Sequence, residues 1–140
     1  MLYTYDSSKI KFIFGGQPAV GLNDGSFISV ELDEDDWATT RGADGNVVRS
    51  NNQNVIATVT LTLQQTSPYN DYLSGIAIYD KVTGKGVHPI LIKDLFGTTL
   101  LNSRFAFISK RPNISYDIEQ QGREWSFKAV KPYHYVGGNV

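Results

Sequence analysis

The sequence contains no cysteine, and this absence removes several classes of function at once. Disulfide frameworks, thiolate zinc sites and cysteine nucleophiles are all excluded. Only two histidines are present, His88 and His134, and neither has a second imidazole two or four residues away. We therefore expect both to be surface or strand-edge residues and not metal ligands.

A long apolar run and an excess of charge are also missing. No window approaches the roughly 18 apolar residues of a membrane span, and the N-terminus, MLYTYDSSKIKFIF, lacks the continuous apolar core of a secretory signal. The 13 basic and 14 acidic residues nearly balance, and Lys and Arg are scattered. We expect a soluble protein with no membrane insertion and no basic stripe to grip a phosphate backbone.

Motifs for catalysis and metal binding are absent as well. The acidic run 33–36 offers the oxygen ligands that hard cations prefer, but it lacks the glycine and distal glutamate of a calcium loop. The segment 42–45 lacks the Lys-Ser/Thr ending of a phosphate loop, so it predicts a tight turn at Asp44-Gly45. No G-x-S-x-G elbow is present. The sequence predicts a solvated acidic surface, no metal site, no cofactor and no enzymatic activity.

What the sequence does contain is the two-residue alternation of β-strands, clearest in two long stretches, Ser26 to Trp37 and Val55 to Gln65. Their apolar faces consist of Ile28, Val30 and Leu32 in the first stretch and Val55, Ala57, Val59, Leu61 and Leu63 in the second. Their opposite faces carry Ser29, Glu31, Asp33 and Asp35, and Ile56, Thr58, Thr60, Thr62 and Gln64. Each strand therefore has one face for a core and one largely polar face.

The connection between these strands, Ala38 to Asn54, is polar and unusually long. At 17 residues it exceeds the roughly 12 to 15 beyond which structureless loops are usually functional or disordered. We therefore expect this loop to need a partner.

Shorter elements surround the two strands. A strand is expected at Lys9 to Phe14, followed by a turn at Asn23-Asp24-Gly25. Ser67-Pro68 predicts the start of a helix to about Val82, with a stripe formed by Tyr69, Tyr72, Leu73, Ile76, Ala77 and Tyr79, and Gly84 predicts its end. Further strands are expected at Pro89 to Leu95, Thr98 to Ser109 and Arg123 to Lys131, with Tyr133 to Val136 docked on the domain. The predicted fold is mostly β, a β-sandwich or barrel with one flanking α-helix, in a single domain over residues 1–140.

Several segments, in order over nearly the whole chain, carry a family resemblance: YDSSKIKFIFGG, DGSFISVELDEDDW, RGADGNVVRS, VTLTLQQTSPYNDYLS, KDLFGTTLL, REWSF and the terminal VGGN. In these segments the chain resembles the tail tube proteins of contractile-tailed bacteriophages. The resemblance implies a fold shared with the tube protein of type VI secretion, in which strands of each subunit contribute to a continuous barrel that lines a channel.

The resemblance also implies a function. Such subunits form hexameric rings that stack into a hollow tube within a contractile sheath, and the genome crosses the tube without specific binding. The implied partners are copies of the chain itself, the sheath protein, the baseplate and tail terminator components. The implied location is the virion, after synthesis in the host bacterial cytoplasm.

The resemblance implies roles for two surfaces of this chain. The long loop would reach the neighbouring ring through Arg41, Gly42, Asp44, Gly45, Val47, Val48 and Arg49. The channel wall would be formed by Ser29, Glu31, Asp33, Thr58, Thr60, Thr62 and Gln64. Carboxylates and hydroxyls suit a DNA conduit, because each phosphate contact from Lys or Arg would add affinity and hold the polymer.

Two other readings remain open at this point. A tube subunit of a phage-derived secretion device or a pyocin-like particle would have the same architecture, because fold alone does not separate these functions. A small β-sandwich that binds a glycan is a different class, and it would use Trp37, Tyr133 and Tyr135 as stacking platforms. Rings or tubes seen by microscopy would favour a tube, and glycan binding by a monomer would favour the module.

Overall fold

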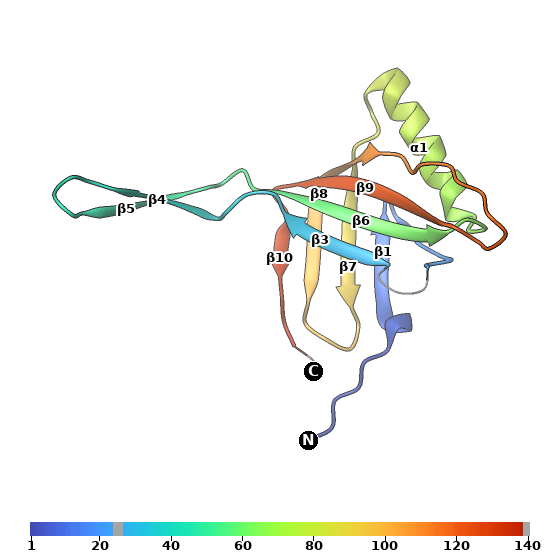
Figure 1. The fold of residues 1–140 in the computed structure, drawn as a ribbon, viewed down its shortest axis with the longest axis horizontal. Helices are drawn as coiled ribbons and strands as arrows, with labels where there is room; N and C mark the ends of the chain where they lie inside the picture. The colour runs from blue at the N-terminus through green and yellow to red at the C-terminus, as the bar shows by residue number, and fades with distance from the viewer. Residues whose placement is uncertain (24–26, 139–140) are drawn as a thin grey trace.

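A strongly curved β-sheet dominates the computed structural model, with one helix at one end and a long projection at the other (Figure 1). The structure describes residues 1–23 and 27–138. The predicted turn at Asn23-Asp24-Gly25 and the predicted strand start at Ser26 therefore lie largely outside the described residues.

The elements follow one another in a mostly β order. They are η1 (Ser7–Lys9), β1 (Ile10–Phe14), β2 (Gln17–Pro18), β3 (Ile28–Leu32), β4 (Trp37–Arg41), β5 (Val47–Asn51), β6 (Ile56–Gln64), α1 (Tyr69–Thr83), β7 (His88–Asp94), β8 (Leu100–Lys110), β9 (Gly122–Val130) and β10 (Tyr133–Tyr135). The predicted fold class, mostly β with one helix, is confirmed. Across residues 1–23 and 27–138, no helix has the length and apolar character that crossing a membrane requires.

The main sheet has the strand order β2-β1-β7-β8-β9-β6-β3, and β10 pairs with β8. The sheet folds over on itself, because the ring of Phe127 on β9 lies 5.4 Å from Phe12 and 5.1 Å from Phe14 of β1, measured between ring centroids. Beyond β2 the chain crosses to the far edge, where Leu22 forms an isolated antiparallel bridge with Leu63. The result is an open, curved sheet in which β1 and β9 face each other across the core.

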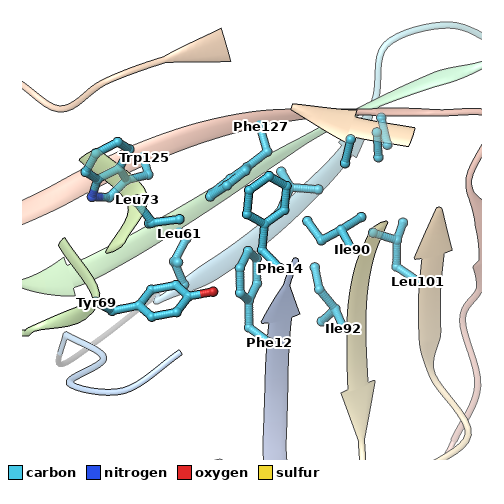
Figure 2. Packing of buried hydrophobic residues seen from close by; sticks show 14 of the residues in the cluster. Phe12, Phe14, Leu61, Tyr69, Leu73, Ile90, Ile92, Leu101, Trp125 and Phe127 are labelled. Atoms are coloured by element: carbon cyan, nitrogen blue, oxygen red, sulfur yellow. The ribbon is translucent and has the colours of Figure 1, made fainter. Parts of the chain in front are cut away.

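The core fills the inside of this curved sheet (Figure 2). Strand β6 alternates buried and half-buried residues along its whole length, as its sequence predicts. Trp125, Phe127 and Ala129 of β9 are buried beside it. Burial of these apolar faces is the main stabilising contribution to the sheet.

Helix α1 begins and ends close to the predicted residues. The Ser67 hydroxyl accepts a hydrogen bond from the backbone N–H of Tyr69 (3.2 Å), while Pro68 occupies the N-cap position and not the first helical turn. Gly84 ends the helix in the left-handed conformation (φ 69°). Five of the six residues of the predicted stripe face the core, because Tyr69, Leu73 and Ala77 are buried and Tyr72 and Ile76 are partly buried against it. The prediction is wrong for Tyr79, which is 51% exposed.

Two predictions about the segment between Leu32 and Ile56 are wrong. The first long strand does not continue to Trp37, because pairing with β6 ends at Leu32 and the chain turns away over residues 33–36. The connection 38–54 is not structureless, because β4 and β5 form an antiparallel hairpin within it. Paired Thr and Val residues, which favour strands, supply the local reason.

Candidate functional site: the hairpin arm and the polar face

The hairpin formed by β4, β5 and their turn, residues 37–51, projects far from the sheet, and we call it the arm (Figure 1). All residues of both strands are exposed. Within the described chain, β4 and β5 pair only with each other. Isolated two-stranded hairpins are at best marginally stable in water, so the arm is suited to a partner that covers it.

A tight turn forms the tip of the arm. The N–H of Gly45 donates to the carbonyl of Gly42 (3.1 Å), and the N–H of Gly42 donates to the carbonyl of Asn46 (2.7 Å). Gly45 has φ of 89°, the left-handed conformation that follows a type I turn in a three-residue hairpin loop. The Asp44 side chain accepts from the Asn46 backbone and side chain (3.3 and 2.8 Å). The predicted tight turn at Asp44-Gly45 is confirmed.

The two faces of the arm differ in chemistry. One face carries the pairs Trp37–Asn51, Thr39–Arg49 and Arg41–Val47, and the other carries Ala38–Ser50 and Thr40–Val48. On the first face the guanidinium of Arg49 lies 3.9 Å from the centre of the Trp37 ring. This cation–π contact stiffens the half of the arm nearest the sheet and leaves Arg41 and Val47 near the tip.

At the root of the arm, where residues 34–36 and Asn52 lie side by side, Asn52 holds the two chain segments together. Its backbone N–H donates to the carbonyl of Asp36 (2.8 Å), and its side-chain amide donates to the Glu34 carboxylate (2.7 Å) and the Asp35 carbonyl (3.3 Å). Glu34 of the acidic run therefore helps to hold the two chains of the root together. In the described part of the chain, no three acidic or histidine side chains gather in a way that could hold a metal ion.

The outward side of the sheet over β3, β6 and β9 carries mostly polar residues, and we call it the polar face. It consists of Ser29, Glu31 and Asp33, Thr58, Thr60, Thr62 and Gln64, and Glu124, Ser126 and Lys128. The register sets these side chains in rows across the strands, such as Ser29–Thr60–Ser126 and Glu31–Thr58–Lys128. The structure thus brings together all seven residues that the resemblance assigned to a channel wall.

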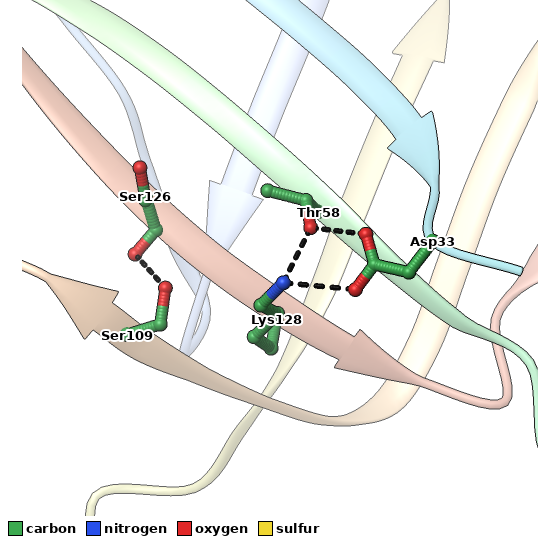
Figure 3. A network of polar contacts seen from close by, with 5 residues as sticks. All are labelled: Asp33, Thr58, Ser109, Ser126 and Lys128. Carbon is green, nitrogen blue, oxygen red and sulfur yellow. Dashed lines mark hydrogen bonds and ion pairs between the residues drawn. The ribbon is translucent and has the colours of Figure 1, made fainter.

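The polar face also contains an ion pair that the sequence prediction missed (Figure 3). Lys128 Nζ lies 2.8 Å from Asp33 Oδ2 and donates to Thr58 Oγ1 (2.6 Å), while the Thr58 hydroxyl donates to Asp33 Oδ1 (2.5 Å). The hydrogen bond from Lys128, followed by that from Thr58, lowers the pKa of the Asp33 carboxyl below its usual value. The alternation in 123–131 places Lys128 opposite the apolar side of its strand, and that signal could have identified it.

Charge on the polar face is consequently only weakly negative. Three carboxylates, Glu31, Asp33 and Glu124, stand against one cation, Lys128, and Asp33 and Lys128 neutralise each other. The remaining members are hydroxyls and one amide. Such a surface offers no free cation to an anionic polymer within the described polar face, and it is well hydrated.

The three aromatic residues considered for glycan stacking lie on different elements. Trp37 lies on the arm beneath Arg49, and Tyr133 and Tyr135 lie on β10, which is paired with β8 as the predicted docking of the tail requires. The Arg49 contact occupies one face of the indole, which a sugar ring would otherwise use.

A family model described as Bacteriophage PhiTE tail tube protein matches residues 14–137. The chain belongs to this family of phage tail tube proteins. A curated relative, the structural protein ORF10 of Pseudomonas phage KPP10, is 31% identical over 121 residues, which cover 85% of this chain and 70% of the relative. A solved structure of the tube-terminating cap of the anti-feeding prophage matches with a TM-score of 0.64 at 14% identity, over 96% of this chain and 94% of that chain. At this low identity, the similarity to the cap structure is a similarity of fold alone.

Membership confirms the predicted resemblance to phage tail tube proteins. This tail tube protein is a structural component of a phage tail, and its partners are copies of itself and other tail components. The family has a structural role, which agrees with the expectation that the chain is not an enzyme.

Proposed function

We propose that this tail tube protein assembles into hexameric rings that stack inside a contractile sheath and form the channel through which the genome is ejected. The subunit would contact sheath, baseplate and tail terminator components as well as its own copies, and it would be made in the host cytoplasm. One domain, residues 1–140, would supply both the ring contacts and the channel wall.

The observation that carries this proposal is the arm. Its strand residues are all exposed, and it pairs with nothing else in the described chain. Because no residue of its strands is buried, contact with another molecule would supply the stabilisation by burial that the arm lacks within its own subunit. The neighbouring ring is the partner that the proposal assigns to Arg41, Gly42, Asp44, Gly45, Val47, Val48 and Arg49.

A second supporting feature is the free edge of β3. Among residues 1–23 and 27–138, β3 is the terminal strand of the main sheet and pairs with β6 on one side only. An unpaired edge presents N–H and C=O groups that another chain can complete. In the proposed ring, this edge is covered by the adjacent subunit, which extends the sheet around the channel.

The polar face would then line the channel. Its hydroxyls and carboxylates give DNA no strong phosphate contact, and screening over a Debye length of about 8 Å keeps the repulsion from Glu31 and Glu124 short-ranged. Sixfold repetition would turn each side chain into a ring of six. The apolar side of the same strands faces the core.

Electron microscopy of the purified full-length protein, at high concentration or with an initiating baseplate component, tests the proposal. We expect rings or tubes with sixfold symmetry. A protein that remains monomeric under every condition, including within virions, would contradict self-assembly.

Deletion of residues 42–50 tests the arm separately. The variant should keep the circular dichroism spectrum and unfolding temperature of the parent, because the arm buries no core residue. It should form rings but no stacked tubes. Tube yields equal to those of the parent would contradict an inter-ring role for the arm.

A further inference from the structure

A large groove runs beside α1, bounded on the other side by the end of β8 and the segment that follows it. Its volume is about 1340 Å³. Small-molecule sites usually enclose about 300–1,000 Å³ and are mostly apolar, whereas this groove is larger and has a mixed lining. Its size and its lining suit a segment of polypeptide.

The groove has three chemically distinct parts. The helix wall carries the carboxylates of Asp71 and Asp80 and the ammonium group of Lys81, the opposite rim carries Lys110 and Arg111, and Arg123 also lines the groove. Apolar side chains complete the lining, among them Ile114 and Tyr116, which are each 78% exposed, and the buried Trp125. Exposed apolar side chains beside a concave surface are typical of a protein interface.

We propose that this groove receives the tip of the arm from the axially adjacent copy. This inference rests on the proposed function, which assigns the arm to a neighbouring ring, and it names the surface of that neighbour which the arm contacts. The occupant is therefore a second copy of this chain.

Position along the molecule supports this pairing. The arm leaves the sheet just before Ile56 at the start of β6, and Gln65 and Thr66, just after the end of β6, line the groove. At roughly 3.3 Å per residue, strand β6 separates the two surfaces by about 30 Å. Figure 1 shows the arm at one end of the long axis and the first turn of α1 at the other. A contact between unlike surfaces at opposite ends of a subunit repeats head to tail and builds an open stack.

The chemistry of the arm matches each part of the groove. Val48, 58% exposed, would lie on Ile114 and Tyr116 of one rim, while Val47, 62% exposed and on the opposite face of the arm beside Arg41, would lie on the helix wall. Arg41 would face the carboxylates of Asp71 and Asp80 on the helix wall, and Asp44 would face Lys110 and Arg111 on the opposite rim. Among the described residues Lys128 and Asp33 form the only ion pair, so no opposite charge of the same subunit neutralises the tip or the groove walls, although the Asp44 carboxylate accepts hydrogen bonds from Asn46 and that of Asp80 accepts one from the N–H of Gly86.

Cysteine cross-linking tests the contact directly, because the chain has no cysteine of its own. A chain carrying both Val48→Cys and Ser74→Cys, assembled into tubes and treated with a short bismaleimide, should give a ladder of covalent multimers on a denaturing gel. Each single variant alone should give no ladder. A matched control, Val48→Cys with Thr60→Cys on the polar face, should also give none.

The outcomes separate this inference from the proposed function. Tubes that form without the Val48–Ser74 ladder would overturn the groove as the receiving surface and leave the tube intact. Failure of the unmodified protein to form any tube would overturn both.

A charge reversal provides a second measurement that does not depend on cysteine placement. Asp71→Lys should lower the tube yield by roughly tenfold or more, because like charges brought together across an interface cost several kcal/mol. Asp117→Lys, an exposed acidic residue outside the groove lining, should leave the yield unchanged. Equal yields from both variants would contradict the inference, provided that both unfold at the parent temperature.

Discussion

Lys128 is the residue at which this tail tube protein departs most from a simple acidic surface. A free lysine on a channel wall would add sequence-independent affinity for DNA, because each neutralised phosphate releases a counterion. Here the ammonium group is held by Asp33 and Thr58 in a network of three residues. The ion pair is partly solvated, because the side chain of Lys128 is 34% exposed and that of Asp33 is 29% exposed. Asp33 therefore masks the one cation of the polar face.

Removing the Asp33 charge that neutralises Lys128 gives a first prediction. In virions carrying Asp33→Asn, genome ejection should be slower than in the parent at roughly 50 mM salt, and the difference should shrink at roughly 200 mM, because phosphate contacts weaken steeply with salt. Ejection kinetics in vitro measure this effect. The double variant Asp33→Asn/Lys128→Gln should recover the parent rate, and a double variant as slow as the single one would contradict the masking role.

The same pair gives a second prediction, in the pH dependence. Because the pKa of Asp33 is lowered in the folded state, the stabilisation from the pair is fully present above the unfolded value of about 3.9. It is lost as the pH falls through the lower folded value. An NMR titration should find the Asp33 pKa below the usual range in the parent and shifted back toward it in Lys128→Gln. An unshifted pKa in the parent would contradict the network.

At the scale of elements, the corner between β6 and α1 depends on Asn70. Its Oδ1 accepts from the indole N–H of Trp125 (2.9 Å), and its Nδ2 donates to the carbonyls of Gln64 (3.0 Å) and Ser67 (3.2 Å). One side chain thus joins the strand end, the helix start and β9. This corner also positions the helix wall of the groove.

Asn70→Ala should therefore destabilise the fold by about 1–3 kcal/mol, because it leaves the buried indole N–H without an acceptor. Urea unfolding of the unassembled protein measures the cost. Trp125→Phe removes the same hydrogen bond from the other side, so the two changes together should cost less than their sum. Additive costs would show that the two side chains act independently.

The arm is an element of another kind, because its conformation depends on its own turn and not on the core. Gly45→Val should disfavour the hairpin by about 1–3 kcal/mol, since a β-branched residue is strained at φ of 89°. The unfolding temperature of the sheet should stay unchanged while tube assembly falls. Ala43→Val in the same turn, where φ is not positive, is the matched control. A lowered unfolding temperature for Gly45→Val would mean that the arm stabilises the sheet.

At the scale of the whole molecule, the arm and the groove give the subunit two different ends along its long axis. A copy that lacks residues 42–50 keeps its groove, so it can bind the arm at the end of a growing tube. It has no arm tip to insert into the groove of the next copy. Mixing this deletion variant with the parent should shorten tubes in proportion to its fraction, as measured by electron microscopy. Tube lengths that do not change with the fraction would contradict head-to-tail growth through the arm.

The sequence by itself determined the fold class, the two faces of the long strands and the ends of the helix. These features are local: the alternation in residues 55–65 records which side is buried, and Ser67 and Gly84 act on the backbone beside them. The arm could not be predicted from alternation, because β4 and β5 are exposed on both faces and their sequences therefore carry no buried side.

Only the tertiary structure decided what these elements form together. The ion pair joins Asp33 and Lys128, 95 residues apart, and it exists because β3, β6 and β9 lie side by side. The groove exists because α1 and the segment after β8 lie on its two sides, and no local pattern encodes that arrangement. Burial is recorded residue by residue in the sequence, whereas surfaces assembled from distant strands depend on the path of the whole chain.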